Sequence, residues 1–487
     1  MNKTTAPNEV ADNHDPVSGA KTRITARGKV RPRLVLASLV LAIASFQLNS
    51  TMLSPAIGDM SARLGTSPGF IGWSSTVFLA VAAALSILLP PFADQIGRRN
   101  ALLGSVAVMI VGTVIALVSS DALWLLVGRA LQGFVGAAFA LSNLTLRSIL
   151  EPRKYGSYLG LMAAVNSGIA GVDTLLGGII VDAVGYKGIL AVILAVAVSA
   201  MVTLFAWTPE TRIAETGRMD WSGALTMTGA LWGLNMVLTL GFGTAGWANP
   251  VTVLFAVGAI GCGVGFWFAE SRTAHPLIPL AVLRQRQTWG LLVTTFCTLA
   301  SAFATLLFTL PALSQDADNG FGMTGTASAL LYLTPFSLLG WILAPLAGKV
   351  APRVGYRLVL RFGLAGSLIC LVAMVFATHD RWLLFILALL IGATYSAASN
   401  TTLNGLGVLY STQRRPGVLP GLNSAAFNMG AAVGMGLMSS LVIRAQVDGA
   451  AAHGYSLALV VGAVFALLAL VFSFLLPGRT SDSAEVI

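Results

Sequence analysis

Two ionisable side chains fall inside stretches of sequence that otherwise carry no charge. Asp173 is the one acid among nineteen Asp and Glu residues that lies well inside an apolar segment, and Arg129 is the one base in such a position. A charge in lipid costs several kcal/mol unless it is paired or neutralised, so an intramembrane acid is a functional candidate by default. We predict that Asp173 binds and releases a proton.

Arg129 is expected at a depth similar to that of Asp173. At about 1.5 Å per helical residue, Arg129 and Asp173 lie roughly 10 and 15 Å from the outer ends of their segments, which permits a pair. We therefore expect the proton affinity of Asp173 to depend on whether Arg129 is near. The alternative is static: a fixed Asp–Arg pair, or an Asp bonded to Ser and Thr hydroxyls, that holds helices together.

Uncharged polar residues recur in the same apolar segments. Amides that faced lipid would lack hydrogen-bond partners, so they should face the protein interior. About half are expected to join helices, and the remainder to line a polar substrate cavity, with Phe46, Trp73 and Phe139 as further apolar walls. The candidate cavity residues are Gln47, Asn49, Gln132, Asn143, Asn166, Tyr395, Asn400, Asn404, Asn423 and Phe427.

The composition excludes a soluble globular protein. Hydrophobic residues make up 56% of the chain, charged residues only 10%, and the mean hydropathy is +0.82. The three cysteines all lie in apolar runs, and neither a disulfide framework nor a metal motif is present. We therefore expect no metal and no cofactor.

The apolar runs predict fourteen transmembrane helices of about 20 residues or more. The charge-free stretch 221–269 is too long for one helix, and we divide it at the Gly241–Pro250 cluster of helix breakers. The expected spans are 34–57, 70–89, 101–119, 123–146, 158–181, 188–207, 222–241, 250–269, 288–311, 327–347, 359–377, 382–407, 419–443 and 456–476.

The basic residues predict how the chain is oriented. Most of the 29 Lys and Arg residues fall in the loops on the side of the N-terminus, and the opposite loops contain only Arg63, Lys187, Arg381 and Arg444. Under the positive-inside rule both termini are cytoplasmic. This distribution also accounts for the net charge of +10 without a nucleic-acid partner.

A compact charged turn, Asp94-Gln-Ile-Gly97-Arg98-Arg99, separates two apolar runs and has a counterpart later in the chain. Gly97 corresponds to Gly355, and Arg99 to Arg357. Two further matches in nearly the same register, Ser142-Asn143 with Ser399-Asn400 and Asn166-Ser167 with Asn423-Ser424, favour a duplicated membrane unit.

The predicted fold is an all-α membrane protein with fourteen helices arranged 6+2+6. We expect a disordered cytoplasmic tail at 1–33, a six-helix bundle at 34–207 and an inserted helix pair with cytoplasmic linkers at 208–287. A second six-helix bundle then spans 288–477, and a cytoplasmic tail spans 478–487.

The chain resembles the major facilitator superfamily, specifically its fourteen-span drug:proton antiporters. Ala93–Arg99 is similar to the superfamily's loop signature, which locks the two bundles together on the cytoplasmic side. Arg129-Ala-Leu-Gln132-Gly133 is similar to the signature whose arginine is implicated in proton coupling. The resemblance implies a conformational lock comprising Asp94, Gly97, Arg98, Arg99, Arg353 and Arg357.

Three positions depart from the pattern of this family. Pro90 replaces the glycine that begins the loop signature, and Asp173-Thr174 replaces the Gly-Pro pair of the antiporter motif. Phe46 stands where cation pumps of this type carry an acid, so a partner for lipophilic cations is missing. Neutral or anionic substrates therefore have comparable weight.

The leading expectation is a proton-coupled exporter of a drug or small organic solute that works by alternating access. The alternatives are a proton-coupled uptake symporter for an organic metabolite and, more remotely, a non-transporting sensor or an intramembrane enzyme. Gly348-Lys349 is followed by Val350, so no phosphate loop supports an ATP-driven pump. We expect a monomer in the lipid bilayer of a bacterial inner membrane, with protons and a small organic substrate as its partners.

Overall fold

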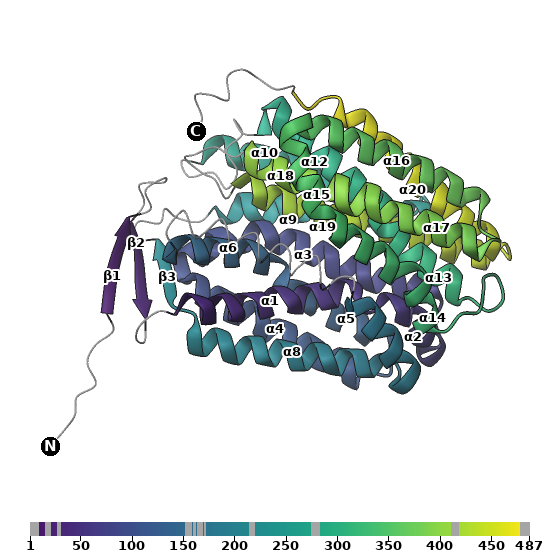
Figure 1. Cartoon of the computed structure of the whole chain (residues 1–487), viewed down its shortest axis with the longest axis horizontal. Coiled ribbons are helices and arrows are strands. Elements are labelled where there is room, and N and C mark those ends of the chain that lie inside the picture. Colours follow the sequence, from purple (N-terminus) through teal and green to yellow (C-terminus); the bar gives the residue numbers. More distant parts are fainter. Residues whose placement is uncertain are drawn as a thin grey trace.

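The structure is a computed structural model that describes residues 9–14, 21–26, 31–150, 158, 162, 169, 172–213, 220–273, 283–410 and 418–477. Nearly all of them are helical, and the long helices run side by side (Figure 1). Thirteen of the described helices are long and apolar enough to cross a membrane. The chain is therefore a multi-pass membrane protein. The remaining expected span, 158–181, lies partly outside the described residues, and residues 172–184 of this region are helical.

The first half of the chain forms six helical units, and several are built from consecutive segments. In chain order the segments are α1 (Pro32–Thr51), the 3₁₀ turn η1 (Ser54–Ala56), α2 (Ile57–Leu64), α3 (Pro68–Ile96), α4 (Arg98–Val118), α5 (Ala122–Gln132), the 3₁₀ turn η2 (Gly133–Ala137), α6 (Ala138–Ile149), the 172–184 helix and α8 (Tyr186–Trp207).

The second half contains four π-helical segments, which lie within three of its long helices. After the inserted pair α9 (Trp221–Phe242) and α10 (Pro250–Arg272) come α12 (Arg286–Thr298), η3 (Leu299–Phe303), η4 (Thr305–Thr309), α13 (Leu310–Gln315), α14 (Gly325–Ser328), η5 (Ala329–Leu333), α15 (Thr334–Val354), α16 (Tyr356–Phe376), α17 (Arg381–Ile391), η6 (Gly392–Asn400), α18 (Thr401–Leu409), α19 (Val418–Val447) and α20 (Ala451–Ser473). The segments η3 to η6 are the π-helical ones.

The two halves meet along α3 and α19, which pack over their length. A Cβ added at Gly72 of α3 would collide with side chains of the second half, so the missing side chain permits the close approach. Two side-chain hydrogen bonds cross this contact. Trp73 Nε1 donates to Ser440 Oγ at 3.1 Å, and Asn428 Nδ2 donates to Ser86 Oγ at 3.2 Å.

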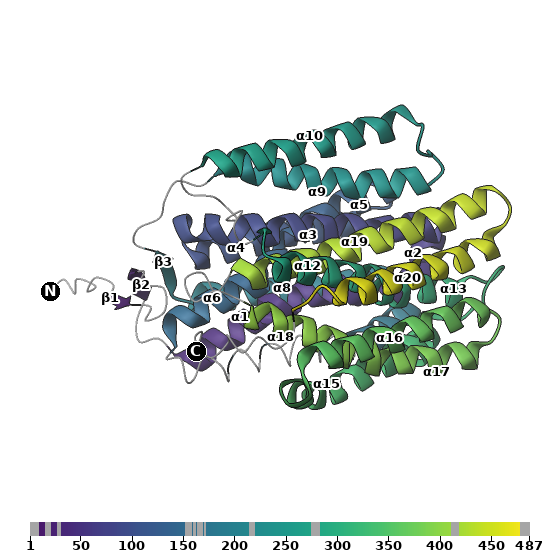
Figure 2. The same cartoon turned by 90° about the horizontal axis from the view of Figure 1, so that it is seen from above.

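The inserted pair lies along one side of the other helices (Figure 2). α9 contacts α3 and α19, whereas most of α10 is exposed and packs mainly on α9. In a membrane that exposed surface, which includes Leu254, Val257 and Ile260, faces lipid. The division of the charge-free stretch at Gly241–Pro250 is confirmed, since α9 ends at Phe242 and α10 begins at Pro250.

The backbone repeats the turn that the sequence singled out. Gly97 has φ 102° and ψ 136°, and Gly355 has φ 108° and ψ 128°. Each is the one residue between two helices, and the helix that follows is 21 residues long in both cases. Asp121 and Asp380 then cap the next helix of each half through backbone N–H groups. The expected duplication is therefore present in the conformation of the chain.

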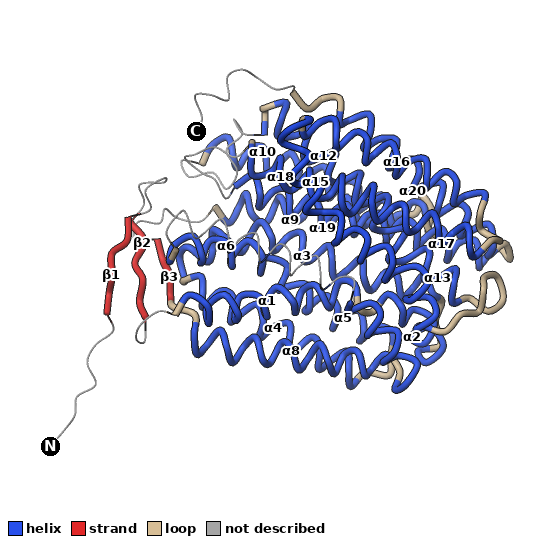
Figure 3. Tube along the Cα trace, in the orientation of Figure 1, coloured by secondary structure: helices blue, strands red, loops and turns tan. Residues whose placement is uncertain are grey.

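The segment expected to be a disordered tail contains two strands. β1 (Glu9–His14) pairs antiparallel with β2 (Lys21–Ala26), and β2 pairs antiparallel with β3 (Glu210–Ile213), which follows α8. Figure 3 shows these strands beyond one end of the helices. The expectation of a tail without regular structure is corrected at these residues, whereas the all-α membrane fold is confirmed because nearly all of the described residues are helical. The backbone hydrogen bonds of β2 come partly from β3, far away in sequence, so no local pattern announced them.

Replacing Gly97 with Ala should destabilise the protein more than replacing Gly355 with Ala. Both glycines have a positive φ that other residues adopt at a cost of about 1–3 kcal/mol. An added Cβ at Gly97 would also meet the Glu210 carboxylate, whereas nothing lies within 4 Å of the corresponding position at Gly355. Thermal unfolding in detergent measures the difference, and equal losses of stability would contradict the role assigned to Glu210.

Candidate functional site

Arg129 is buried at the end of α5 with its guanidinium held on several sides. The residue is 1% exposed. Its two terminal nitrogens donate to the side chain and the backbone carbonyl of Asn49 on α1, at 3.2 and 3.1 Å, and one of them also donates to Gln132 Oε1 at 2.9 Å. The guanidinium carbon lies 4.4 Å from the centroid of the Phe78 ring. These contacts fix the charge against α1 and α3.

Gln132 continues this network toward α4. Its Nε2 donates to Thr113 Oγ1 at 3.0 Å, and both side chains are completely buried. Asn49 and Gln132 were expected to line a substrate cavity. In this conformation both amides are instead committed to Arg129, so they join helices of the first half.

Asp173 lies within the helical residues 172–184 and is 2% exposed. Its Oδ2 accepts a hydrogen bond from Thr51 Oγ1, and its Oδ1 has no hydrogen-bond partner among the described residues. One turn further on, a Cβ added at Gly177 would collide with the Met52 carbonyl, so the 172–184 helix presses directly on the end of α1. Thr51 was not among the predicted site residues.

The expected Asp173–Arg129 pair is not formed in this conformation. Within the described part of the chain no ion pair joins the two residues, and each binds a different side of α1. Asn49 and Thr51 are two positions apart, and at about 100° per residue they point in nearly opposite directions. A predicted depth along a helix does not say which neighbour the side chain faces.

The other predicted cavity residues of the first half are less enclosed. Gln47 is half-buried, and its Nε2 lies 3.4 Å from Thr51 Oγ1. Asn143 is half-buried, and its Oδ1 has no hydrogen-bond partner among the described residues. Asn166 lies outside the described residues. Gln47 and Asn143 therefore keep polar groups with spare hydrogen-bonding capacity.

In the second half, the predicted polar residues mostly bind within their own bundle. Asn423 Oδ1 accepts from Thr295 Oγ1 at 2.7 Å, and exposed Asn404 donates to the backbone and side-chain oxygens of Asn400 at 3.0 and 3.1 Å. Two predicted aromatic residues meet other rings. Buried Tyr395 stacks on Phe336 with centroids 6.4 Å apart, and half-buried Phe427 meets Phe303 edge-on at 5.7 Å.

A cavity of about 450 Å³ lies between the two halves at the end of the molecule opposite the strands. Its lining includes Gly58, Ser61 and Thr66 from the first half, and Gln315 and Asn319 from the second. None of the predicted substrate residues lines it. It is therefore a separate feature from the buried polar network around α1.

The charged turn at Asp94 binds within the first half of the chain. Arg98 forms an ion pair with Asp94 at 3.0 Å and donates to the Leu144 carbonyl at 2.7 Å and to Ser148 Oγ. Among the described residues, no hydrogen bond or ion pair joins Asp94 or Arg98 to the second half. The contacts of Asp94 and Arg98 that the structure describes thus stabilise the first half of the chain.

Glu210 ties this turn to β3. Its carboxylate accepts from the backbone N–H groups of Arg99 and Asn100 at 3.2 and 3.3 Å. N–H groups in the first turn of a helix, here α4, have no acceptor within the helix, and Glu210 supplies one. Burial raises the pKa of Glu210 despite these hydrogen bonds and the nearby Arg212. Arg99 also donates to carbonyls of α8 and lies over the Phe205 ring. The turn therefore connects α3, α4 and α8.

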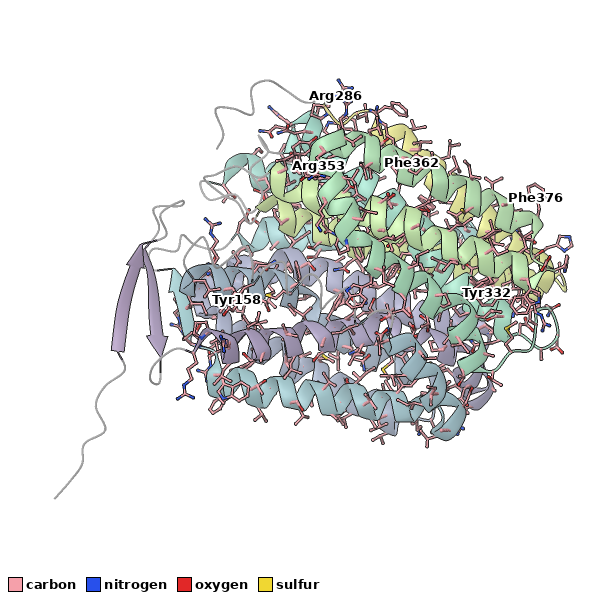
Figure 4. All side chains as sticks on the ribbon, viewed as in Figure 1. Tyr158, Arg286, Tyr332, Arg353, Phe362 and Phe376 are labelled. Carbon is pink, nitrogen blue, oxygen red and sulfur yellow. The ribbon has the colours of Figure 1, made fainter. Side chains whose placement is uncertain are left out.

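The corresponding turn of the second half is more open. Arg353 is exposed, toward the end of the molecule that carries the C-terminus (Figure 4). Arg357 is half-buried, and its Nε has no hydrogen-bond partner among the described residues. The two turns share a backbone shape but differ in their contacts.

At the end opposite the strands, hydrogen bonds join the two halves. Asp182 accepts from the backbone N–H groups of Gly325 and Thr326, at 3.0 and 2.9 Å, at the start of α14 (Figure 1). Gln315 Oε1 accepts from the Gly58 N–H at 2.9 Å. We call these three bonds the Asp182 latch. They close this end of the interface between the halves.

The Asp182 carboxylate of the latch stays ionised over a wide pH range. Burial favours the neutral form, but hydrogen bonds from Thr326, Thr324 and Gly325 outweigh it and hold the pKa of Asp182 below its ordinary value. Because the pKa is depressed, the latch is lost only as pH falls through that lowered value. Asp182 is therefore a permanent anion at neutral pH.

These contacts define what the buried network can do. The side chains of Arg129 and Asp173 both hydrogen-bond the last turn of α1, and one oxygen of the Asp173 carboxylate has no hydrogen-bond partner among the described residues. The described residues contain no group of three or more His, Cys, Asp and Glu side chains that could hold a metal ion. The arrangement suits the exchange of a proton between states of different packing.

The sequence of the chain was also compared with known proteins. The family model of the Major Facilitator Superfamily matches residues 39–334 and again 291–486. A uridine/deoxyuridine transporter of Lactococcus lactis subsp. cremoris is 36% identical over 453 residues, which cover 91% of this chain and 94% of the relative. The multidrug resistance protein Stp of Mycobacterium tuberculosis is 24% identical over 413 residues, covering 84% and 75% of the two chains.

Two further matches agree with these. The puromycin resistance protein pur8 of Streptomyces alboniger is 25% identical over 473 residues, covering 93% of this chain and 92% of the relative. The crystal structure of the human organic anion transporter MFSD10 superposes with a TM-score of 0.60 at 16% identity, covering 92% of this chain and all of that one. The similarity therefore extends over both halves and the inserted pair.

Replacing Arg129 with Lys should impair the protein although the charge is kept. An ammonium cannot reproduce the fork that binds both oxygens of Asn49 and the Gln132 amide, and each lost charged hydrogen bond is worth about 1.5–3 kcal/mol. We expect a lower unfolding temperature in detergent. Arg63→Lys is the control, because Arg63 is exposed and pairs only with Asp59 of its own turn. Equal stability of the two variants would contradict the assigned role.

Replacing Asp182 with Asn should weaken closure at the latch end. Spin labels at Ala62→Cys and Asn319→Cys, in a background without the three native cysteines, report the separation of the two halves there. We expect a larger population of long distances because an amide cannot accept both N–H bonds. Asp448→Asn is the control, since Asp448 is exposed and pairs with Arg444 of the same half. Unchanged distances in Asp182→Asn would refute the latch.

Proposed function

The chain belongs to the major facilitator superfamily, and from this premise we propose that it carries a small neutral solute of the nucleoside class across the membrane, coupled to protons. It is a transporter of small molecules and not an enzyme. The relative that is 36% identical is a uridine/deoxyuridine transporter, whereas the drug-resistance relatives are 23–26% identical. This difference favours a nucleoside over a drug as the substrate.

The chemistry of the inward-facing side chains supports an uncharged substrate. Phe46 occupies the position of the expected acid, and its ring stacks on Phe78 with centroids 5.5 Å apart. Amides with spare capacity, Gln47, Asn143 and Asn400, would hydrogen-bond a base and a ribose. Half-buried Phe427 would cover an aromatic face.

The observation that carries proton coupling is the half-satisfied carboxylate of Asp173. An ionised carboxylate that is 2% exposed, with one oxygen that lacks a hydrogen-bond partner and no ion pair among the described residues, is costly, so a change of packing around it would change its proton occupancy. Arg129 keeps its proton, and its terminal nitrogens are already hydrogen-bonded to Asn49 and Gln132. Asp173 is therefore the proposed proton carrier, and Arg129 is the fixed charge that accompanies it.

Alternating access would use the two halves as moving bodies. Residues 34–207 and 288–477 would rock against each other around a midplane site, with the 208–287 pair attached at α3 and α19. With both termini on the cytoplasmic side, the Asp182 latch would close the external side of the transporter. We propose that a monomer in the bacterial cell membrane suffices.

Drug:proton antiport is the second candidate, and it was the leading expectation from the sequence. The resistance proteins Stp and pur8 support it, since they match most of the chain. Phe46 counts against lipophilic cations as substrates. Direction separates the two candidates, because a symporter moves substrate and protons the same way and an antiporter moves them in opposite ways.

Purified protein in proteoliposomes with an imposed pH gradient tests this proposal. We expect added uridine to change the internal pH, and the sign of that change identifies symport or antiport. Puromycin and an organic anion serve as cationic and anionic comparisons. Proton movement with puromycin but not with uridine would establish the second candidate, and no movement with any of the three would contradict proton coupling to these classes.

Replacing Asp173 with Asn should separate proton movement from substrate exchange. We expect uridine-driven proton flux to fall by about tenfold or more, while uridine–uridine exchange continues, because the amide keeps the shape but cannot titrate. Asp121→Asn is the matched control, as Asp121 is an exposed cap of α5. Full proton flux in Asp173→Asn would remove this residue from the coupling mechanism.

A further inference from the structure

Thr51 Oγ1 has more hydrogen-bond partners than its one proton can serve. It lies 2.9 Å from the Gln47 backbone carbonyl, and it also contacts Asp173 Oδ2. Gln47 Nε2 approaches the same oxygen at 3.4 Å. A hydroxyl donates once and accepts twice, whereas a carbonyl and an ionised carboxylate only accept. Both oxygens cannot receive the Thr51 proton at the same time.

The protonation of Asp173 decides how this conflict is resolved. When Asp173 carries a proton, its O–H donates to Thr51, and Thr51 donates to the Gln47 carbonyl, so every contact is satisfied. When Asp173 is ionised, the Thr51 proton must turn toward the carboxylate, and the bond to the Gln47 carbonyl is lost. The proton passes only to or from Asp173, and the hydroxyl of Thr51 reorients without gaining or losing one.

We propose that Thr51 is the positioning residue that transmits the protonation state of Asp173 to α1. This inference rests on the proposed role of Asp173 as the proton carrier. Thr51 is the last residue of α1, and two residues, Met52 and Leu53, separate it from the η1 turn. A side-chain bond that is made or released at this point acts on a helix end, where fewer backbone bonds hold the chain.

The last turn of α1 also contacts Arg129 and the 172–184 helix. Asn49 holds Arg129 through both its side chain and its carbonyl, and the Met52 carbonyl packs on Gly177 of the 172–184 helix. A shift at Thr51 therefore moves the support of Arg129 and the contact with the neighbouring helix together. Asp173 and Arg129 influence each other through α1 instead of by direct pairing.

Other charged and titratable groups near the 172–184 helix are already engaged elsewhere. On α1 and α2, Asp59 pairs with Arg63, and Arg33 lies at the far end of α1. On η5, the Tyr332 hydroxyl donates to the Arg381 carbonyl. On the helix itself, Asp182 binds the start of α14. None of these groups hydrogen-bonds Asp173 within the described part of the chain.

The experiment measures the pH dependence of opening without any substrate. The Ala62→Cys and Asn319→Cys spin-label pair reports the fraction of open molecules as pH is varied, in otherwise unaltered protein and in Thr51→Val, Thr51→Ser and Asp173→Asn. Valine has the shape of threonine without the hydroxyl, and serine restores the hydroxyl. Ser45→Ala is the control, because Ser45 makes the same kind of backbone bond on α1 without touching Asp173.

We expect Thr51→Val to move the midpoint of this transition to higher pH by about one unit. A hydrogen bond to an ionised carboxylate is stronger than one from a neutral carboxyl group, so loss of Thr51 disfavours the ionised form more. Thr51→Ser and Ser45→Ala should keep the original midpoint. A Thr51→Val midpoint equal to that of the unaltered protein would overturn the inference.

The outcomes also distinguish this inference from the proposed function. If Asp173→Asn abolishes the pH dependence and Thr51→Val leaves the midpoint in place, only the role of Thr51 fails. If Asp173→Asn keeps the pH dependence, or if opening of the unaltered protein ignores pH, Asp173 is not the proton carrier and both proposals fall. Loss of the pH transition in Ser45→Ala would show that any change in α1 suffices, which also contradicts a specific role for Thr51.

Discussion

The rest of this structure depends on the hydrogen bonds that two buried ionisable residues make to one turn of α1. Arg129 holds Asn49 from one side, and Asp173 meets Thr51 from the other. The two terminal nitrogens of Arg129 donate to two amide side chains and a backbone carbonyl, whereas Asp173 has one oxygen without a hydrogen-bond partner among the described residues. The contact of α1 with Arg129 is thus independent of protonation, whereas its contact with Asp173 is sensitive to it. Helix α1 lies between these two residues.

The contacts of the two halves differ between the two ends of the molecule. α3 and α19 bring the halves into close contact, and the Asp182 latch closes one end of that contact with backbone N–H groups as donors. At the other end the Asp94 turn binds α6 and α8 of its own half through Arg98 and Arg99. In the described part of the chain, hydrogen bonds join the two halves at the latch end, whereas the contacts of Arg98 at the other end lie within the first half.

Much of the fold could be predicted from the sequence because the bilayer imposes a simple pattern. The length of the apolar runs located the spans, and Gly97 and Gly355 marked equivalent turns that have almost the same backbone angles. The pairing of β2 with β3 could not be predicted, since its hydrogen bonds join segments far apart in the chain.

The site was harder to predict than the fold for a geometric reason. Sequence position predicted the depths of Asp173 and Arg129 but not the directions in which their side chains point around the helices. A direct pair was therefore expected, although α1 lies between the two side chains. Thr51 was overlooked although it ends a polar run that begins at Gln47, because hydroxyls in helices usually bond to their own backbone. Asn49 and Gln132 were recognised as important, but the structure assigns them to Arg129.

The central claim is that Asp173 changes its protonation when the transporter changes state. Infrared difference spectroscopy of the protein in lipid, with and without uridine, observes this group directly through the carbonyl stretch of a protonated carboxyl. The account predicts a protonated-carboxyl band that changes on addition of uridine and is missing from Asp173→Asn. A difference spectrum that is the same in Asp173→Asn as in the unaltered protein would contradict it.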